Sequence, residues 1–202
     1  MSNISRAALL GLVLIGAGAP LRAQDPGDPD WPCIQRKVEH LSIGVMWPLP
    51  LPEDVEPLPD DLEDIAAQLA LRRVSEDRAR ELLGEVAADH PDFGPDDYGR
   101  LFQATFEHID RQRARIVAGI DRYARNQHAL AGEIDRLQTE MSRLEADPEP
   151  DFDRIDAIEA ELDGRLRVFS DRAKSLTYVC ESPVLLEQRA YALAQMMLKS
   201  AG

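Results

Sequence analysis

Apolar residues in the second half of the chain recur with the spacing of a helical seam. Between residues 102 and 144 they follow one another at alternating steps of four and three residues, the heptad pattern of a coiled coil. Arg113 and Gln127 are the two polar interruptions. The pattern predicts one helix from about residue 97 to residue 146. Its seam positions are Phe102, Phe106, Ile109, Arg113, Ile116, Ile120, Tyr123, Gln127, Leu130, Ile134, Leu137, Met141 and Leu144.

A second seam follows a proline-containing turn. Residues 147–151 read Asp-Pro-Glu-Pro-Asp, and two prolines this close together exclude a helix interior. Beyond them the apolar spacing resumes with one stutter. Ser182 and Pro183 predict an interruption, after which a helix continues to about residue 199. The second seam consists of Ile155, Ile158, Leu162, Leu166, Phe169, Ala173, Leu176 and Cys180, continued by Leu186, Ala190, Leu193 and Met197.

The two helical segments have matching lengths, and the short turn forces them antiparallel. Residues 96–200 are therefore predicted to form a long, coiled-coil-like antiparallel helical hairpin in an all-α protein. Facing residues then have numbers that add up to about 298, which places Cys180 opposite residue 118. Each seam can bury itself only against the other.

The N-terminal third of the chain predicts an extended arm and two short helices. Residues 24–59 contain eight prolines, which predict a proline-rich extended arm with Trp31, Cys33 and Trp47 as anchors. Residues 60–63 form an acidic capping box, and Ser75 is a second N-cap, so residues 60–90 are expected to be a short helical pair. We expect residues 24–202 to be one folded unit.

The first residues have the pattern of a secretory signal peptide. Arg6 precedes an apolar run over residues 7–19, and small residues follow it. We expect residues 1–23 to be removed after Ala23, with Ala19 as an alternative site and an uncleaved anchor as the other interpretation. The apolar run is shorter than the roughly 20 residues of a spanning helix. The prediction is therefore a periplasmic protein that is not integral to the membrane after cleavage.

The sequence contains two cysteines, Cys33 and Cys180, and both follow the signal peptide. In an oxidising compartment an even number of cysteines favours a disulfide. The alternatives are two free thiols or a pair of metal ligands. We expect a disulfide that ties the arm to the hairpin stem.

Charge is strongly segregated along the chain. After removal of the signal peptide 37 acidic and 21 basic residues are left, a net charge of −16, which argues against nucleic acid as a partner. Residues 24–97 carry −13, the stem (98–132 and 164–202) carries +6, and the tip (133–163) carries −9. We expect the acidic N-terminal segments to lie along the basic stem and the acidic tip to project into solvent.

The basic residues of the stem are the candidate partner surface. The alternative is that they receive the chain's own acidic arm, or that they pair within the hairpin, as Asp110 with Arg113 and Asp121 with Arg125. The candidate residues are Arg111, Arg115, Arg122, Arg125, Arg172 and Lys174.

The acidic tip resembles a cation site in composition, but it lacks the central glycine and distal glutamate of a calcium-binding loop. A turn with capping carboxylates is the alternative. Its residues are Asp147, Glu149, Asp151 and Asp153. The four histidines have no metal-ligand spacing, and the sequence contains no catalytic fingerprint or phosphate-binding loop. We therefore expect no catalytic, metal or cofactor site and a protein that is not an enzyme.

One short segment resembles a known motif. Residues 30–38 read Asp-Trp-Pro-Cys-Ile-Gln-Arg-Lys-Val, and this segment is similar to one in small uncharacterised secreted bacterial proteins. The resemblance covers nine residues and implies no activity. The leading functional hypothesis is a non-enzymatic adaptor, scaffold or accessory subunit, monomeric or homodimeric, that binds another envelope protein. The alternatives are a metal- or small-ligand-binding module and a chaperone-like hairpin.

Overall fold

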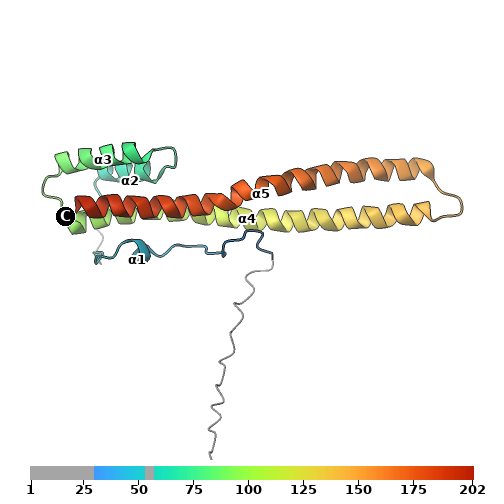
Figure 1. The fold of residues 1–202 in the computed structure, drawn as a ribbon, viewed down its shortest axis with the longest axis horizontal. Helices are drawn as coiled ribbons and strands as arrows, with labels where there is room; N and C mark the ends of the chain where they lie inside the picture. Colours follow the sequence, from blue (N-terminus) through green and yellow to red (C-terminus); the bar gives the residue numbers. More distant parts are fainter. Residues whose placement is uncertain (1–29, 53–56) are drawn as a thin grey trace, which may run out of the picture.

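The computed structural model describes residues 30–52 and 57–202, so the predicted signal peptide lies outside the described residues. The described residues form helices and no strand, and α4 and α5 make one long hairpin (Figure 1). The predicted all-α hairpin is therefore confirmed. None of the described helices combines the length and the apolar character that a membrane crossing requires. The helices are α1 (Ile43–Met46), α2 (Asp60–Ala70), α3 (Glu76–Asp89), α4 (Pro95–Glu145) and α5 (Phe152–Ser200).

The hairpin has the expected register. Helix α4 has 51 residues, which at 1.5 Å per residue is about 77 Å, and α5 has 49. The Asp151 carboxylate accepts a hydrogen bond of 3.0 Å from the Arg154 backbone N–H and so starts α5. Across the hairpin, Arg165 forms an ion pair with Glu133. These two numbers add up to 298, as the antiparallel register requires.

The main core lies at the end of the hairpin away from the turn. Helices α2 and α3 cover one side of this end, and the arm with α1 runs along another (Figure 1). Helix α4 therefore buries residues on more than its seam, including Leu101, Thr105 and Val117. The largest fully buried side chains of this core are Trp47, Tyr98, Phe102, Leu69, Leu101, Ile109, Leu186, Leu193, Met197 and Val86.

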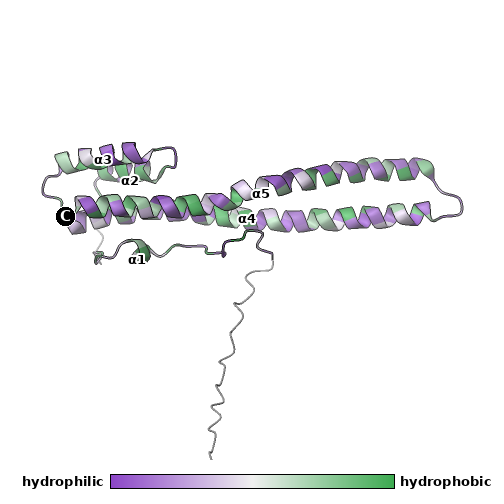
Figure 2. Ribbon diagram, in the orientation of Figure 1, coloured by the Kyte–Doolittle hydropathy of each residue, from purple (hydrophilic) through white to green (hydrophobic). Residues whose placement is uncertain are grey.

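A second, smaller core lies near the tip. It consists of Ile134, Leu137, Ile158 and Leu162, with partly buried residues around them. Green and purple bands alternate along both long helices in Figure 2, as a seam between two helices requires.

Between the two cores the predicted second seam is only partly buried: Phe169 packs against the tip core, but Leu166 and Ala173 are exposed. No residue of α5 from 163 to 179 is buried, and Leu166 is 39% exposed. The stutter explains this, because two successive steps of four residues rotate the apolar stripe away from α4. On the α4 side the same stretch is polar: the Tyr123 hydroxyl and the side-chain oxygen of Gln127 are buried and have no hydrogen-bond partner among the described residues. Burial raises the pKa of Tyr123.

The predicted interruption at Ser182 and Pro183 is wrong. Helix α5 runs through Pro183, although a proline removes one backbone hydrogen bond and crowds the preceding turn. Ser182 does not cap a new helix, and its hydroxyl donates to the Tyr178 carbonyl inside the helix at 3.2 Å. Packing holds the helix on both sides, since Cys180 is bonded to the arm and Leu186 is buried in the main core. Tertiary contacts thus outweigh the local preference.

Of the two N-caps predicted from the sequence, the one at Ser75 is present and the one at residues 60–63 is not. Ser75 caps α3, because its Oγ accepts from the Arg78 N–H at 3.2 Å. Helix α4 begins at Pro95, and the Gly94 N–H donates to the Asp97 carboxylate at 3.0 Å. The capping box expected at residues 60–63 does not form, because Pro59 is the N-cap and offers no side-chain acceptor.

The start of α4 gives a pH-dependent prediction. The hydrogen bond from Gly94, helped by Arg100 at 2.6 Å, lowers the pKa of Asp97. Its stabilising effect is therefore present above the usual carboxyl range and is lost as the pH falls through the lowered pKa. We expect D97A to lower the free energy of unfolding by about 1 kcal/mol at neutral pH and by much less near about pH 2. Urea denaturation at both pH values measures this.

The matched control is D96A in the same turn, because no hydrogen bond to Asp96 is found among the described residues. D96A should lower the free energy of unfolding at neutral pH by less than D97A does. An equal loss for D97A at both pH values would contradict a role for the ionised carboxylate.

Candidate functional site

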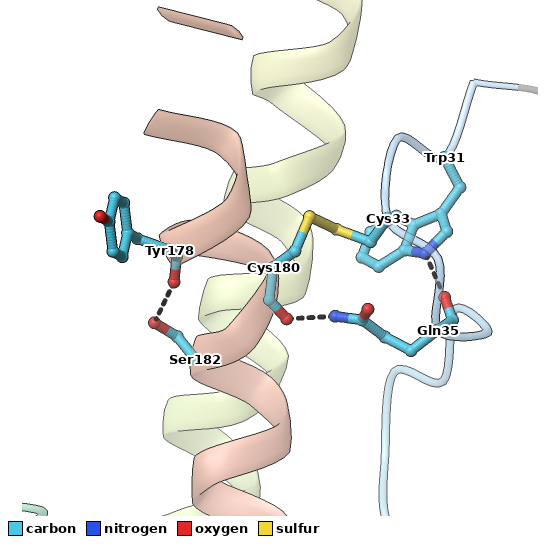
Figure 3. Close-up of a disulfide and its surroundings, with 6 residues drawn as sticks. All are labelled: Trp31, Cys33, Gln35, Tyr178, Cys180 and Ser182. Atoms are coloured by element: carbon cyan, nitrogen blue, oxygen red, sulfur yellow. Dashed lines mark hydrogen bonds between the residues drawn. A yellow bond between two sulfur atoms is a disulfide. The ribbon is translucent and has the colours of Figure 1, made fainter. Parts of the chain in front are cut away.

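The arm is joined covalently to the hairpin stem. Cys33 of the arm and Cys180 of α5 form a disulfide with a Cα–Cα distance of 5.6 Å across 147 residues of sequence. The predicted disulfide is therefore present. Figure 3 shows Cys33 reaching across to α5 from the extended arm. Disulfides of this kind are typical of proteins in an oxidising compartment.

The residues around Cys33 fold into a tight loop on the stem. The Trp31 indole N–H donates to the Gln35 carbonyl at 2.7 Å, and the Gln35 side-chain amide donates to the Cys180 carbonyl (Figure 3). The Lys37 ammonium lies 5.9 Å from the centre of the Trp31 ring. The conspicuous residues of this segment thus dock the arm.

Further along the arm, ionic contacts hold it to α4. Lys37 pairs with Asp121 at 2.7 Å. The carboxylate of Asp110 contacts the His40 ring at 2.6 Å and accepts from the Leu41 N–H at 2.8 Å. The Lys37–Asp121 pair places the cation on the arm and the acid on the stem, the reverse of the expected polarity. Asp30 of the arm lies 3.7 Å from the His128 ring of α4.

Arg113, the polar interruption of the first seam, also holds the arm. Its side chain is 5% exposed, and its guanidinium donates to the backbone carbonyls of Val38 and Glu39. A buried guanidinium needs such acceptors, because burial removes its water. The polar break in the seam therefore marks the place where the arm crosses α4.

The far end of the arm is held by aromatic packing. Trp47 is buried and stacks on Phe102 with ring centroids 5.2 Å apart. The indole also lies over Gly99, one helical turn earlier, where a Cβ would be in ordinary van der Waals contact with Trp47 Nε1 at 3.6 Å. The predicted anchors Cys33 and Trp47 therefore fix both ends of the arm.

Sequence reasoning missed a corresponding role for Arg189 of α5. Its guanidinium donates to the carbonyls of Leu69 and Val74, both at 2.7 Å, and so holds the connection between α2 and α3. Burial lowers the pKa of Arg189. A single arginine in a helix gave no signal of this contact.

The predicted basic surface divides into paired and unpaired residues. Arg111 lies near Glu107 and His108, and Lys174 pairs with Asp171 at 3.2 Å. The other members are exposed and form no ion pair within the described ranges. Those members are Arg115, Arg122, Arg125 and Arg172.

Three of the unpaired arginines share one side of α4. Steps of seven and three residues separate Arg115, Arg122 and Arg125, so they lie in one stripe of the helix. We call these three residues the arginine face. The pair expected between Asp121 and Arg125 does not form, because Asp121 binds Lys37 of the arm. Docking of the arm thus leaves the arginine face without intramolecular partners in the described structure.

The acidic tip is used partly for turn formation. The Asp147 carboxylate accepts from the Glu149 N–H at 3.0 Å, and Asp151 caps α5. Glu149 and Asp153 are exposed. In the described residues no group of three or more histidine, cysteine or carboxylate side chains is placed to hold a metal ion.

Each histidine lies close to a carboxylate from another segment. Two of these contacts join the arm to α4, one joins α2 to α4, and one joins α2 to the end of α3. The pairs are His40–Asp110, His128–Asp30, His108–Glu63 and His90–Asp61. These residues therefore help to hold the segments together.

Comparisons with known proteins gave no relative: no family model, no curated protein and no solved structure matches the sequence or its fold. The functional argument therefore rests on the residues and their geometry.

The disulfide gives a stability prediction. Because it closes a loop of 147 residues, the chain-entropy relation assigns it about 5 kcal/mol. We expect the double variant C33S/C180S to lower the free energy of unfolding by about 3–5 kcal/mol. Urea denaturation of the variant and of the oxidised protein measures the difference. The hairpin should still form, because neither helical core includes the arm residue Cys33.

Amide hydrogen exchange should show the loss of protection first in residues 31–41, the arm segment next to the disulfide. Unchanged exchange there, with the same stability as the oxidised protein, would contradict the role assigned to the bridge.

Proposed function

We propose that this protein is a non-enzymatic interaction protein of the bacterial envelope, an adaptor, scaffold or accessory subunit in the periplasm. It binds an acidic surface of another envelope protein through the arginine face of α4. The observation that supports this most strongly is the unpaired, exposed state of Arg115, Arg122 and Arg125 in a chain whose net charge is −14.

The composition of the chain offers acidic partners to its arginines. Acidic residues outnumber basic ones by 37 to 23, so an arginine has many carboxylates to choose from. Elsewhere the chain uses them: Arg78, Arg80 and Arg165 each contact two acidic side chains. The arginine face contacts no acidic side chain among the described residues. The nearest acids of α4, Asp110 and Asp121, contact His40 and Lys37 of the arm instead.

The geometry suits a carboxylate-bearing partner. From residue 115 to residue 125 the arginine face extends about 15 Å along a rigid helix. A guanidinium binds a carboxylate through two parallel hydrogen bonds, which makes arginine the preferred cation at protein interfaces. One exposed ion pair contributes little, but several aligned charges set the orientation and the rate of association.

The compartment fits the same proposal. The disulfide indicates an oxidising environment. Together with the signal-peptide pattern of residues 1–23, this supports the periplasm.

The test is affinity capture after in-cell crosslinking, with the full chain tagged at its C-terminus. We expect the wild type to recover a reproducible envelope partner and R115E/R122E/R125E to recover at least about tenfold less of it. Once the partner is purified, its affinity should fall with rising salt, because exposed charges are screened.

The matched control is R72E/R73E/R167E, which changes the net charge by the same amount at exposed positions that form no ion pair among the described residues. This variant should recover the partner as the wild type does. Equal recovery by the arginine-face variant, or recovery of no partner by the wild type, would contradict the proposal.

A further inference from the structure

An apolar groove runs between the arm and α5 beside the disulfide. One hollow of about 440 Å³ is lined by Cys33 and Ile34 of the arm and by Leu176, Cys180 and Leu185 of α5. A neighbouring hollow of about 420 Å³ is lined by Val45, Met46 and Tyr191. Both include Val184 and Gln188, so the two hollows form one groove. From residue 176 to residue 191 it extends about 23 Å along α5.

The edges of this groove expose large apolar side chains. Ile34 is fully exposed, Val45 is 80% exposed, and Tyr191 is 54% exposed. Both arm residues lie in the segment whose ends are fixed by Cys33 and Trp47. Neighbouring apolar residues held outward on a fixed backbone are typical of a surface that another molecule covers.

The charges at the groove have one sign. Among its lining residues the acidic side chains are Glu181 and Glu187, and neither forms an ion pair within the described parts of the chain. No lysine or arginine lines either hollow. An occupant that places apolar side chains in the groove therefore gains from basic residues at its flanks.

A second copy of the chain fits this groove less well. A twofold interface would bring the same edge of two molecules together, and with it Glu181 and Glu187 of both. Each copy also carries a net charge of −14. Like charges at such short range oppose association.

We infer that this groove binds a short apolar segment of a partner protein that is flanked by lysine or arginine residues. The site is separate from the arginine face, which lies on α4 and takes acidic groups. The two surfaces prefer opposite charges. They share no residue, so substitutions in one leave the other intact.

The test uses three fluorescein-labelled synthetic peptides of equal length, each about 16 residues long, a length that spans the groove either extended or helical. One alternates leucine with lysine, one leucine with glutamate, and one serine with lysine. Fluorescence anisotropy with the full-length oxidised protein should show the leucine–lysine peptide binding at least about tenfold more tightly than either of the others.

The decisive variant is I34D/V45D, which should weaken binding of the leucine–lysine peptide at least about tenfold. Both substitutions add negative charge, so attraction of a basic peptide to an acidic protein would be strengthened by them. The matched control is L166D/V168D on the distal part of α5, where the side chains are 39% and 44% exposed. It adds the same charge outside the groove and should leave the affinity unchanged, as should R115E/R122E/R125E.

Several results would overturn the inference. Equal affinity of wild type and I34D/V45D would remove the groove as the site. If the serine–lysine peptide binds as tightly as the leucine–lysine peptide, charge alone explains the binding. If the leucine–glutamate peptide binds as tightly, the two glutamates do not select the occupant. A dimer in sedimentation that I34D/V45D dissociates would assign the groove to a second copy. Because Ile34 and Val45 are exposed, circular dichroism of the variant should match the wild type.

Discussion

Two helices can bury only the narrow stripe along which they meet, and this constraint governs the whole structure. Near the tip the stripe gives a core of only four buried residues. The main core exists because α2, α3 and the arm cover further sides of the opposite end. Attachment of the N-terminal segments is thus the interaction on which the stability of the hairpin depends.

That attachment uses a small set of contacts that differ in kind. A disulfide and a stacked tryptophan fix the two ends of the arm, and Arg113 and Arg189 hold backbone carbonyls of the N-terminal segments. Because the arm takes the carboxylates of Asp110 and Asp121, it also decides which arginines of α4 lack a partner. The same contacts that build the fold therefore create the surface proposed for binding.

The hairpin was predictable because heptad spacing is a local property of the sequence. The disulfide was predictable because two cysteines that follow a signal-peptide pattern have few alternatives. The course of the arm was not predictable from the sequence. In the sequence Arg113 is only a polar interruption of the seam, and nothing there indicates that the arm crosses α4 at this residue. The interruption predicted at Pro183 is wrong because the low helix preference of proline does not take account of the tertiary packing on either side of it. Overall charge predicted that arm and stem meet, but individual pairs depend on register, and Lys37 carries the charge opposite to that of the acidic segment around it.

The candidate surfaces were predictable to different degrees. The basic residues of the stem could be found by counting charge, but only the structure separates the paired Arg111 and Lys174 from the unpaired arginine face. The groove gave no sequence signal, because its two walls are 147 residues apart in the chain at the disulfide and meet only in the folded protein.

Site-specific photocrosslinking in cells tests the central claim most directly. A photoreactive residue at Ala118, an exposed position between Arg115 and Arg122, reports on what contacts the arginine face. The same residue at the exposed Ala160 near the tip is the reference. The account predicts a discrete adduct with one acidic envelope protein from position 118, lost in R122E/R125E, and none of it from position 160. Adducts from position 160 alone, or an adduct from position 118 that charge reversal leaves unchanged, would contradict it.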